Sequence, residues 1–215
     1  MIIDTHMHCL EGSDDSHVSI LEIVNKAKEK GLDGICITDH DSIRAKDIAY
    51  KVAKETGFNI FVGCEILTFE GDMVVFGLDE IPKEKMHAQD FLDLVQKKNG
   101  ISISAHPFRE NNRGIGNSIK DLKGLSGIEG FNGNTKAYNN LRACAIAMEL
   151  NIPIFGASDC HHAHEVGKYA TVFPDGIKNE KDLIEAIKSG NVYPVAYKNG
   201  SYEKLIDFEN NFIQW

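Results

Sequence analysis

The sequence predicts an α/β protein in which strands and helices alternate around a parallel sheet. Two observations predict this class. Short runs rich in β-branched and apolar residues recur along the chain, and segments with one apolar helical face separate most of them. About seven such units suit a closed barrel, although periodicity alone does not separate a barrel from an open, doubly wound sheet. Neither a repeat nor a linker interrupts the pattern, so one domain is expected.

The first half of the chain is expected to hold two helices and four strands. A leucine, a valine and an alanine share one face of the helix expected over 21–31, and Gly31 should cap its end. Ser42 is the expected N-cap of a helix over 42–57. The residues EGD separate the last two strands and predict a hairpin. The strands are expected at 2–4, 33–38, 59–69 and 73–78.

The second half continues the alternation. Four short apolar runs predict strands, and three longer segments with helical periodicity lie between or beside them. The strands are expected at 101–106, 127–133, 152–159 and 191–197, and the helices at 84–98, 137–150 and 180–189.

Composition excludes several classes of function. The net charge of −9 argues against broad binding to nucleic acid or anionic membranes, which usually needs clustered lysine and arginine. Five cysteines without a CxxC pair indicate neither a disulfide framework nor a structural zinc finger. No apolar run approaches the roughly 20 residues of a membrane span, and no leader is evident. A reducing cytoplasm is the expected compartment.

Histidines and carboxylates follow five of the expected strands. They are His6 and His8, Asp39 to Asp41 around His40, Glu65, His106, and Asp159 with His161. The carboxyl ends of strands are where α/β folds build their active sites. Alternate residues of a strand face the same way, so the pairs at 6 and 8 and at 159 and 161 can converge. Nitrogen and oxygen ligands suit zinc, manganese or iron, and the neighbouring cysteines should face the core.

The motifs DTHMH, TDHD, GCE, AHP and SDCH occur in this order and resemble the successive motifs of the polymerase and histidinol phosphatase (PHP) family. The resemblance covers about residues 1–197. It implies a distorted (β/α)7 barrel with two or three divalent transition metals at the C-terminal ends of the strands. Residues 198–215 would be a tail on the same domain. Its Phe208, Phe212 and Trp215 could pack across the barrel bottom or contact a second copy.

The resemblance also implies a ligand set. The first metal would be held by His6, His8, Glu65 and Asp159. The second would be held by His40, His161 and Asp15, with Asp14 as the alternative acid. Glu65 would bridge to a third metal shared with His106. Several members complete that site with a histidine near the position of GIEGFNG, where this chain offers Glu129, Asn132 and Asn134. The third metal is therefore expected to bind less tightly.

The chemistry expected of such a site is phosphate ester hydrolysis. A water that bridges two metals loses a proton near neutral pH, and the resulting hydroxide would be the nucleophile. Arg109 follows His106 by three residues and is expected to grip the phosphate in a bidentate manner, which makes it the candidate catalytic residue. Arg113 is a second candidate for substrate binding. The leading interpretation is a phosphatase or phosphodiesterase acting on a small phosphorylated molecule, such as a phosphate monoester or nucleotide.

Three other functions remain open at this point. Amidohydrolase barrels also begin with HxH, but they commonly bridge their metals with a modified lysine where this chain has Glu65. A non-catalytic metal-binding module that regulates a partner would not require so complete a ligand set. A nuclease acting on long strands would need a basic groove or a stripe of stacking aromatic residues. The natural substrate, the identity of the metals and the oligomeric state are not determined by the sequence.

Overall fold

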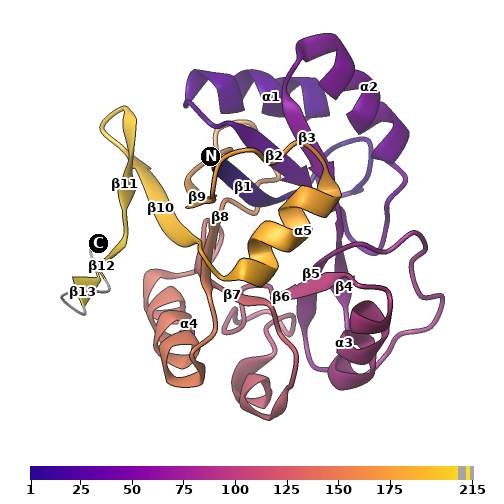
Figure 1. Ribbon diagram of the computed structural model, residues 1–215, viewed down its shortest axis with the longest axis vertical. Coiled ribbons are helices and arrows are strands. Elements are labelled where there is room, and N and C mark those ends of the chain that lie inside the picture. Colours follow the sequence, from indigo (N-terminus) through magenta and orange to yellow (C-terminus); the bar gives the residue numbers. More distant parts are fainter. Residues whose placement is uncertain (208–211, 214–215) are drawn as a thin grey trace.

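The computed structural model describes residues 1–207 and 212–213 and has the predicted α/β character (Figure 1). Five α-helices accompany the strands in the described residues: α1 (Ile20–Glu29), α2 (Lys46–Thr56), α3 (Ala88–Lys97), α4 (Ala137–Leu150) and α5 (Glu180–Ser189). The first eight strands are β1 (Ile2–Met7), β2 (Gly34–Ile37), β3 (Asn59–Val62), β4 (Cys64–Leu67), β5 (Asp72–Phe76), β6 (Ile101–Ser104), β7 (Gly127–Asn132) and β8 (Ile154–Ala157). The others are β9 (Tyr169–Val172), β10 (Tyr193–Lys198), β11 (Ser201–Lys204), β12 (Ile206–Asp207) and β13 (Phe212–Ile213). A short 3-10 helix, Gly116–Asp121, lies between β6 and β7.

The strands form two mixed sheets and a small ribbon. The larger sheet has six strands in the order β11-β10-β9-β1-β2-β3, and only the pairs β1–β2 and β2–β3 are parallel. The second sheet has five strands in the order β4-β5-β6-β7-β8, with an antiparallel hairpin of β4 and β5 at one side. The predicted hairpin is therefore confirmed. Strands β12 and β13 pair only with each other in the described part of the chain.

The two sheets meet at both sides without forming one continuous ring of strand pairs among the described residues. On one side, Gly63 alone separates β3 from β4, so the chain runs directly from the first sheet into the second. On the other side, Met7 and Cys160 form a single parallel bridge, and the Asp159 amide donates a hydrogen bond to the His6 carbonyl. The expectation of one parallel sheet is thus wrong, and a closed barrel is not established by these pairings.

The antiparallel strand β9 explains why β8 and β1 do not pair along their length. It pairs with the first residues of β1, Ile2 and Ile3, at the place that β8 would otherwise occupy. The hydroxyl of Thr171 instead accepts a hydrogen bond from the Gly156 amide at 3.0 Å and donates one to the Gly156 carbonyl at 2.9 Å. One side chain therefore pairs with the amide and the carbonyl of Gly156 at the edge of β8, in place of backbone hydrogen bonds to a neighbouring strand.

The buried apolar residues form three clusters, because successive side chains of a strand point to opposite faces of its sheet. One cluster lies beneath α1 and α2, and a second lies beneath α3 and α4. The third occupies the space between the sheets, where Phe61, Phe76 and Ile103 meet Ile184 and Ile187 of α5. Helix α5 crosses the strands in Figure 1 and closes one end of this inner core. The polar strand ends described below lie at the other end.

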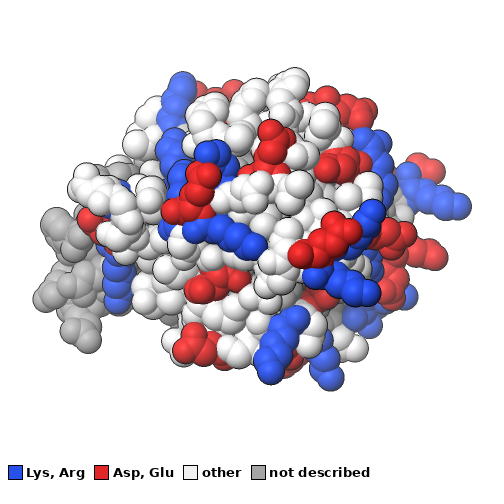
Figure 2. All heavy atoms as spheres, turned by 90° about the horizontal axis from the view of Figure 1, so that it is seen from above, with Lys and Arg blue, Asp and Glu red and all other residues white. Residues whose placement is uncertain are grey.

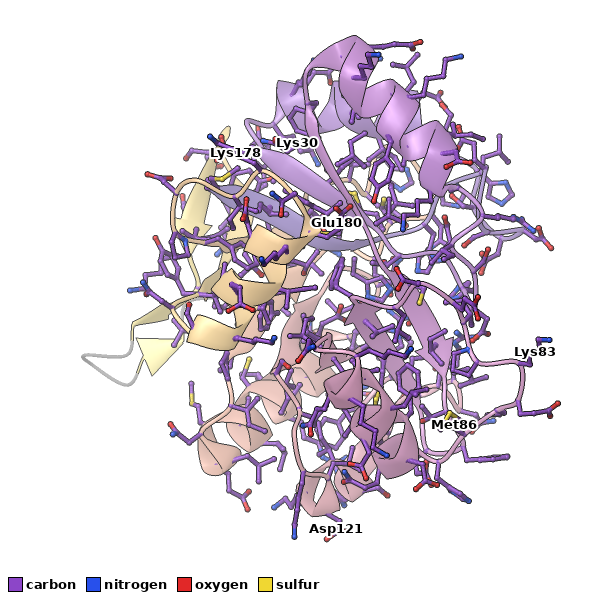
Figure 3. The ribbon with its side chains drawn as sticks, turned by 45° about the vertical axis from the view of Figure 1, so that its right-hand side comes forward. Lys30, Lys83, Met86, Asp121, Lys178 and Glu180 are labelled. Carbon is purple, nitrogen blue, oxygen red and sulfur yellow. The ribbon has the colours of Figure 1, made fainter. Side chains whose placement is uncertain are left out.

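The first turn of α5 is tied to the larger sheet through Glu180, which Figure 3 labels at the start of the helix. One of its carboxylate oxygens accepts hydrogen bonds from the Tyr50 hydroxyl at 2.7 Å and from the Val62 amide at 3.2 Å. The Asn179 side chain caps the helix by accepting from the Asp182 amide at 3.0 Å. These contacts fix the helix across the end of the inner core.

Of the two helix caps expected from the sequence, one differs from the structure and one agrees with it. Helix α2 begins at Lys46 with Ala45 as its N-cap, whereas the Ser42 hydroxyl accepts from the Arg44 amide in the preceding turn. The predicted cap at Ser42 is wrong because its side chain satisfies a local turn instead. Gly31 follows the last turn of α1 with a φ of 77°, as a helix-ending glycine should.

The end of the chain is described in part. Strand β11 pairs with β10, and Leu205 and Ile206 are buried in the cluster beneath α3 and α4. Phe208 and Trp215 lie outside the described residues, as does the side chain of Phe212. Among the residues that are described, no helix has the length and apolar character needed to cross a membrane.

Candidate metal centre

The histidines and carboxylates that follow the strands converge on one buried cluster. His6 belongs to β1 and His8 follows it, Glu65 belongs to β4, and Asp159 follows β8. The side chains of all four are at most 1% exposed. Burying this many ionisable groups without a compensating charge is unfavourable, so the cluster indicates a site built for cations.

The first group brings together the four ligands expected for the first metal. The Nε2 atoms of His6 and His8 lie 3.0 Å apart. Asp159 Oδ1 lies 3.6 Å from His6 Nε2 and 3.2 Å from His8 Nε2. Glu65 places Oε1 3.6 Å from His6 Nε2 and Oε2 3.5 Å from His8 Nε2. The side chains therefore surround one point, as the alternate spacing along β1 suggested.

The second group lies nearer the surface. Asp15 Oδ2 is 3.2 Å from His40 Nε2 and 3.5 Å from His161 Nε2. The ring of His8 stacks between the other two imidazoles, with centroids 4.1 Å from His40 and 4.3 Å from His161. Asp14 points elsewhere and accepts a hydrogen bond from Arg44 at 2.7 Å. The structure therefore places Asp15 rather than Asp14 beside the two histidines.

A third group contains an acid that the motifs do not indicate. His106 Nε2 lies 2.8 Å from Glu65 Oε1 and 3.8 Å from Asp72 Oδ2, and all three side chains are buried. Burial and then the charge of Glu65 raise the pKa of Asp72 to about 7. In the sequence, Asp72 is the last residue of the EGD turn expected between two strands. The hairpin register could have identified it, because Val74 lies opposite Glu65 and Asp72, two residues earlier, faces the same side.

Two candidate ligands hold an unusual backbone conformation. His106 has a φ of 29° and Asp159 a φ of 52°, both in the left-handed region that non-glycine residues rarely adopt. Each residue lies where its strand has just ended and the chain turns sharply. Strain of this kind persists where the surrounding structure enforces it, and it is concentrated at functional sites.

The carboxylates of the first group are held in their charged form. Burial opposes the ionisation of Glu65, but the charge of His6 and a hydrogen bond from His106 outweigh it. Burial also opposes the ionisation of Asp159, and the charge of His6 and the adjacent His8 ring overcome it. The pKa of each carboxyl is therefore well below its usual range. Charged oxygens are the state that a metal ion requires.

The donor set fits divalent metals on a further observation. Glu65 Oε2 and Asp159 Oδ1 are buried oxygens without a hydrogen-bond partner in the described residues, although histidine nitrogens surround both. His40 Nδ1 lies only 2.6 Å from Glu65 Oε2 without hydrogen-bond geometry. Buried oxygens that lack hydrogen-bond partners within a polar cluster indicate a binding site for an ion. Mixed imidazole and carboxylate donors are typical of zinc, manganese and iron sites.

Outer residues fix the orientation of the histidines. Glu129 Oε1 lies 2.6 Å from His6 Nδ1, so the opposite ring nitrogen, Nε2, faces the cluster. Its other oxygen accepts hydrogen bonds from the His106 amide at 3.0 Å and from Asn132 Nδ2 at 2.9 Å. Asn134 donates to the Asp159 carbonyl at 2.5 Å. The polar residues of GIEGFNG and the asparagine after it thus brace the candidate ligands.

His8 has a support of its own in the loop that follows β1. Its Nδ1 lies 3.3 Å from the Ser13 hydroxyl, which donates a hydrogen bond to Asp39 at 2.7 Å. Asp39 also accepts from the Cys9 amide at 2.8 Å. Burial and then the charge of Asp39 raise the pKa of the Cys9 thiol. This cysteine therefore stays protonated and serves as a buried packing residue rather than a metal ligand.

The two arginines suggested by the sequence both reach the cluster. Arg109 donates hydrogen bonds to Asp159 Oδ2, to Asn132 at 2.6 Å and to Thr135 at 3.2 Å. Arg113 donates from Nε to Asp72 at 2.6 Å. The Arg109 side chain is 17% exposed and that of Arg113 is 29% exposed, so each guanidinium lies at the edge of the cluster.

Comparisons with known proteins find relatives of this chain. Over 130 residues, 60% of this chain and 75% of the other, the chain is 31% identical to an uncharacterised protein of Methanocaldococcus jannaschii. Over 129 residues it is 27% identical to a protein of Caldicellulosiruptor saccharolyticus named a probable phosphatase. That match covers 55% of this chain, which spans half the length of the Caldicellulosiruptor protein.

A solved structure shares the fold. It is a two-domain protein of Bacteroides vulgatus described as containing a predicted PHP-like metal-dependent phosphoesterase. The TM-score is 0.71 at 19% identity, and the match covers 92% of this chain and 65% of the other. Residues 137–192 match the PHP-associated family and residues 4–120 match the PHP domain. The second match covers more than half of the chain and includes most of the candidate ligands, and on this evidence the protein belongs to the PHP domain family.

Proposed function

We propose that the protein is a metal-dependent phosphoesterase that hydrolyses a small phosphorylated molecule, either a phosphate monoester or a nucleotide. The observation that carries the proposal is the position of Arg109. Its guanidinium lies against Asp159 at the edge of a cluster suited to two or three zinc, manganese or iron ions. A site with adjacent metals and a fixed arginine provides what phosphate transfer requires, namely positioning and neutralisation of charge.

The candidate ligands would bind the metals, and Arg109 would bind the phosphate. One ion would be held by the first group, which consists of His6, His8, Glu65 and Asp159. A second ion would be held by His40, His161 and Asp15. Bound there, the ions would lower the pKa of a coordinated water and neutralise phosphate oxygens. Arg109, oriented by Asn132 and Thr135, would turn from Asp159 toward a phosphate oxygen. A guanidinium can offer two parallel N–H groups to a phosphate.

The surroundings of the cluster favour a small substrate. A cavity of about 400 Å³ opens beside Asp15 and His40, and another of about 280 Å³ opens beside Arg109 and Thr135. Volumes of this order hold a small molecule. On the face shown in Figure 2, which is the top of the view in Figure 1, acidic and basic side chains are interspersed.

We also propose that the two sheets act together as the distorted (β/α)7 barrel expected of residues 1–197, with the tail packing on the same domain. The direct passage from β3 to β4 and the bridge between Met7 and Cys160 support this arrangement. Leu205 and Ile206 in the core support the place of the tail.

The function is tested with a panel of phosphate monoesters, diesters and nucleotides, together with a carboxyl ester and an amide. The protein is stripped of metal and reconstituted separately with zinc, manganese and iron. We expect hydrolysis of phosphate esters in at least one metal form. The Glu65→Gln variant should lose both metal and activity, whereas Asp14→Asn, a matched change at an exposed acid paired with Arg44, should retain both.

Other outcomes select the competing functions. Hydrolysis confined to the amide or carboxyl ester would favour an amidohydrolase. Cleavage confined to oligonucleotides would favour a nuclease. Tight metal binding without hydrolysis in any metal form would favour the non-catalytic module. Equal metal loss in the two acid variants would contradict the ligand assignment.

A further inference from the structure

The guanidinium of Arg113 lies within the third group of candidate ligands. Its Nε donates to Asp72 Oδ2 at 2.6 Å, and its Nη2 lies 3.7 Å from Glu65 Oε2. The same Nη2 is 3.1 Å from His40 Nδ1. Two of the three residues that could hold a third metal, Glu65 and Asp72, are therefore already in contact with a permanent positive charge.

The backbone holds Arg113 in this place. The Asp72 amide donates a hydrogen bond to the Arg113 carbonyl at 2.8 Å, so the arginine and its carboxylate partner are joined twice. The neighbouring Gly71 fits closely, since a Cβ there would lie 2.4 Å from the Ile115 amide nitrogen and 2.9 Å from the Arg113 carbonyl. The loop is thus seated on the start of β5 by main-chain contacts, independently of the ion pair.

We propose that Arg113 is a built-in cation that takes the place of a third metal, so that the working centre consists of two metals and one guanidinium. This inference rests on the proposed function, because it assigns the charges of the same centre. A divalent ion held by Glu65, Asp72 and His106 would lie within a few ångströms of the guanidinium and would be repelled by it. Asp72 would have to share its charge between two cations.

The arrangement gives Arg113 a role that a loosely held third metal would not provide. Arginine keeps its charge throughout the physiological pH range and cannot be removed by a chelator. Its side chain is 29% exposed, so part of the guanidinium can face a bound phosphate while Nε remains on Asp72. The centre would then present a fixed set of positive charges whatever the supply of the third ion.

The test is a count of metals in the wild-type chain and in matched variants. The protein is loaded with manganese and analysed by elemental analysis, by competition with a chelator, and by anomalous scattering from crystals. We expect two ions in the wild type and three in Arg113→Met, whose third ion should bind roughly tenfold or more tightly than in the wild type. Arg113→Lys should keep two ions because it retains the charge.

Two controls isolate the site. Arg142→Met makes the same change at an exposed arginine that bonds Asn117, and it should keep two ions. The double variant Arg113→Met with Asp72→Asn should return from three ions to two, because it removes a ligand as well as the guanidinium. Circular dichroism and thermal melting check that each variant is folded, and the anomalous map of the wild type decides the question if Arg113→Met does not fold.

The outcomes separate this inference from the proposed function. Three fully occupied anomalous peaks in the wild type, one of them between Glu65, Asp72 and His106, would overturn the inference and leave the function standing. Two ions in both the wild type and a folded Arg113→Met would also overturn it, since the guanidinium would then not be what prevents a third ion from binding. Fewer than two ions in the wild type would overturn the proposed function and the inference with it.

Discussion

At the scale of single residues, the side chains that hold the candidate ligands matter as much as the ligands. Glu129 contacts His6 Nδ1 at 2.6 Å and accepts from the His106 amide at 3.0 Å. Burial opposes its ionisation, but the charge of His6 outweighs this and lowers the pKa of Glu129. One buried carboxylate thus orients ligands on two strands, which is a common arrangement around metal sites.

The Glu129→Gln variant tests this role. The amide keeps the shape of the side chain but loses the charge that fixes the tautomer of His6, so metal affinity should fall about 10- to 100-fold. Competition with a fluorescent chelator measures the affinity. Glu110→Gln, at an exposed acid that bonds Tyr138 and Lys136, is the matched control and should change nothing. Equal affinities in the two variants would contradict the role of Glu129.

Arg109 gives a second prediction at the same scale. Replacing it with alanine should leave metal content intact but cost about 2–4 kcal/mol of transition-state stabilisation, or roughly 30- to 1000-fold in kcat/KM. Lysine should restore only part of the loss because it lacks the planar fork. Steady-state kinetics with a phosphate ester, alongside elemental analysis, measure both quantities. An alanine variant as active as the wild type would make Arg109 only a bracing residue for Asp159.

Single residues also show what the sequence could and could not predict about the site. The alternate spacing of His6 and His8 was sufficient to expect them on one face, because strand geometry has a fixed period. Asp72 needed the register of β5 on β4, which is a matter of pairing between segments. Glu129 needed the position of β7 relative to β1, which depends on the tertiary fold. Local pattern therefore identified candidate ligands more readily than their supports.

At the scale of elements, the junction of β3 and β4 carries a strict steric requirement. Gly63 is the one residue between these strands, and a Cβ there would lie 2.4 Å from the Val75 carbonyl oxygen and 2.7 Å from the Phe76 ring. Strand β5 can approach the junction this closely only because residue 63 has no side chain. Glu65 follows two residues later, so the junction also positions a candidate bridging ligand.

Gly63→Ala should therefore destabilise the protein by about 2 kcal/mol or more, because backbone atoms cannot move aside cheaply. Urea denaturation followed by circular dichroism measures the free energy of unfolding. Gly57→Ala is the comparison: its φ is 65° and nothing lies within 4 Å of the added Cβ, so only the backbone strain of about 1 kcal/mol applies. A smaller loss at Gly63 than at Gly57 would contradict the steric argument.

Most helices and strands could be predicted from the sequence, with errors that have local causes. Helix α4 spans 137–150 and α5 spans 180–189 as expected, because apolar periodicity marks both. Strand β9 was not predicted, since Tyr169–Val172 is short and has no distinct alternation. That omission mattered, because β9 occupies the edge of β1 and gives the larger sheet its antiparallel half.

At the scale of the whole molecule, the same strands carry an apolar core at one end and the cluster of candidate metal ligands at the other. We call the end with the candidate ligands the mouth. Helix α5 closes the apolar end, and the candidate metal ligands occupy the other. Buried acids in the mouth repel one another when no metal is bound, so bound metal should stabilise the entire fold. With free metal about 1000-fold above its dissociation constant, the stabilisation is about 4 kcal/mol, or a rise of about 10 °C in Tm.

This stabilisation should weaken in acid. In the metal-free chain, burial opposes protonation of His6, but the charges of Glu129 and Asp159 outweigh it and raise the pKa of the ring well above its usual range. A metal must displace that proton, so the gain in Tm should shrink as the pH falls below neutrality. Calorimetry with and without metal over a pH series measures the gain. A gain that is independent of pH would show that His6 is not a ligand.

The first group of candidate ligands is more deeply buried than the second, and this difference should affect how fast each bound metal ion exchanges with metal in solution. Asp15 is 57% exposed, whereas Glu65 and Asp159 are at most 1% exposed. An ion held by Asp15 can leave after a loop side chain swings away, but an ion held by the buried group must wait for strand ends to separate. The inner ion should have the longer residence time, so that its identity records which metal was present when the chain folded. Exposure to an enriched zinc isotope should then replace the zinc in two phases, and a single phase for both ions would show that the mouth opens as one unit.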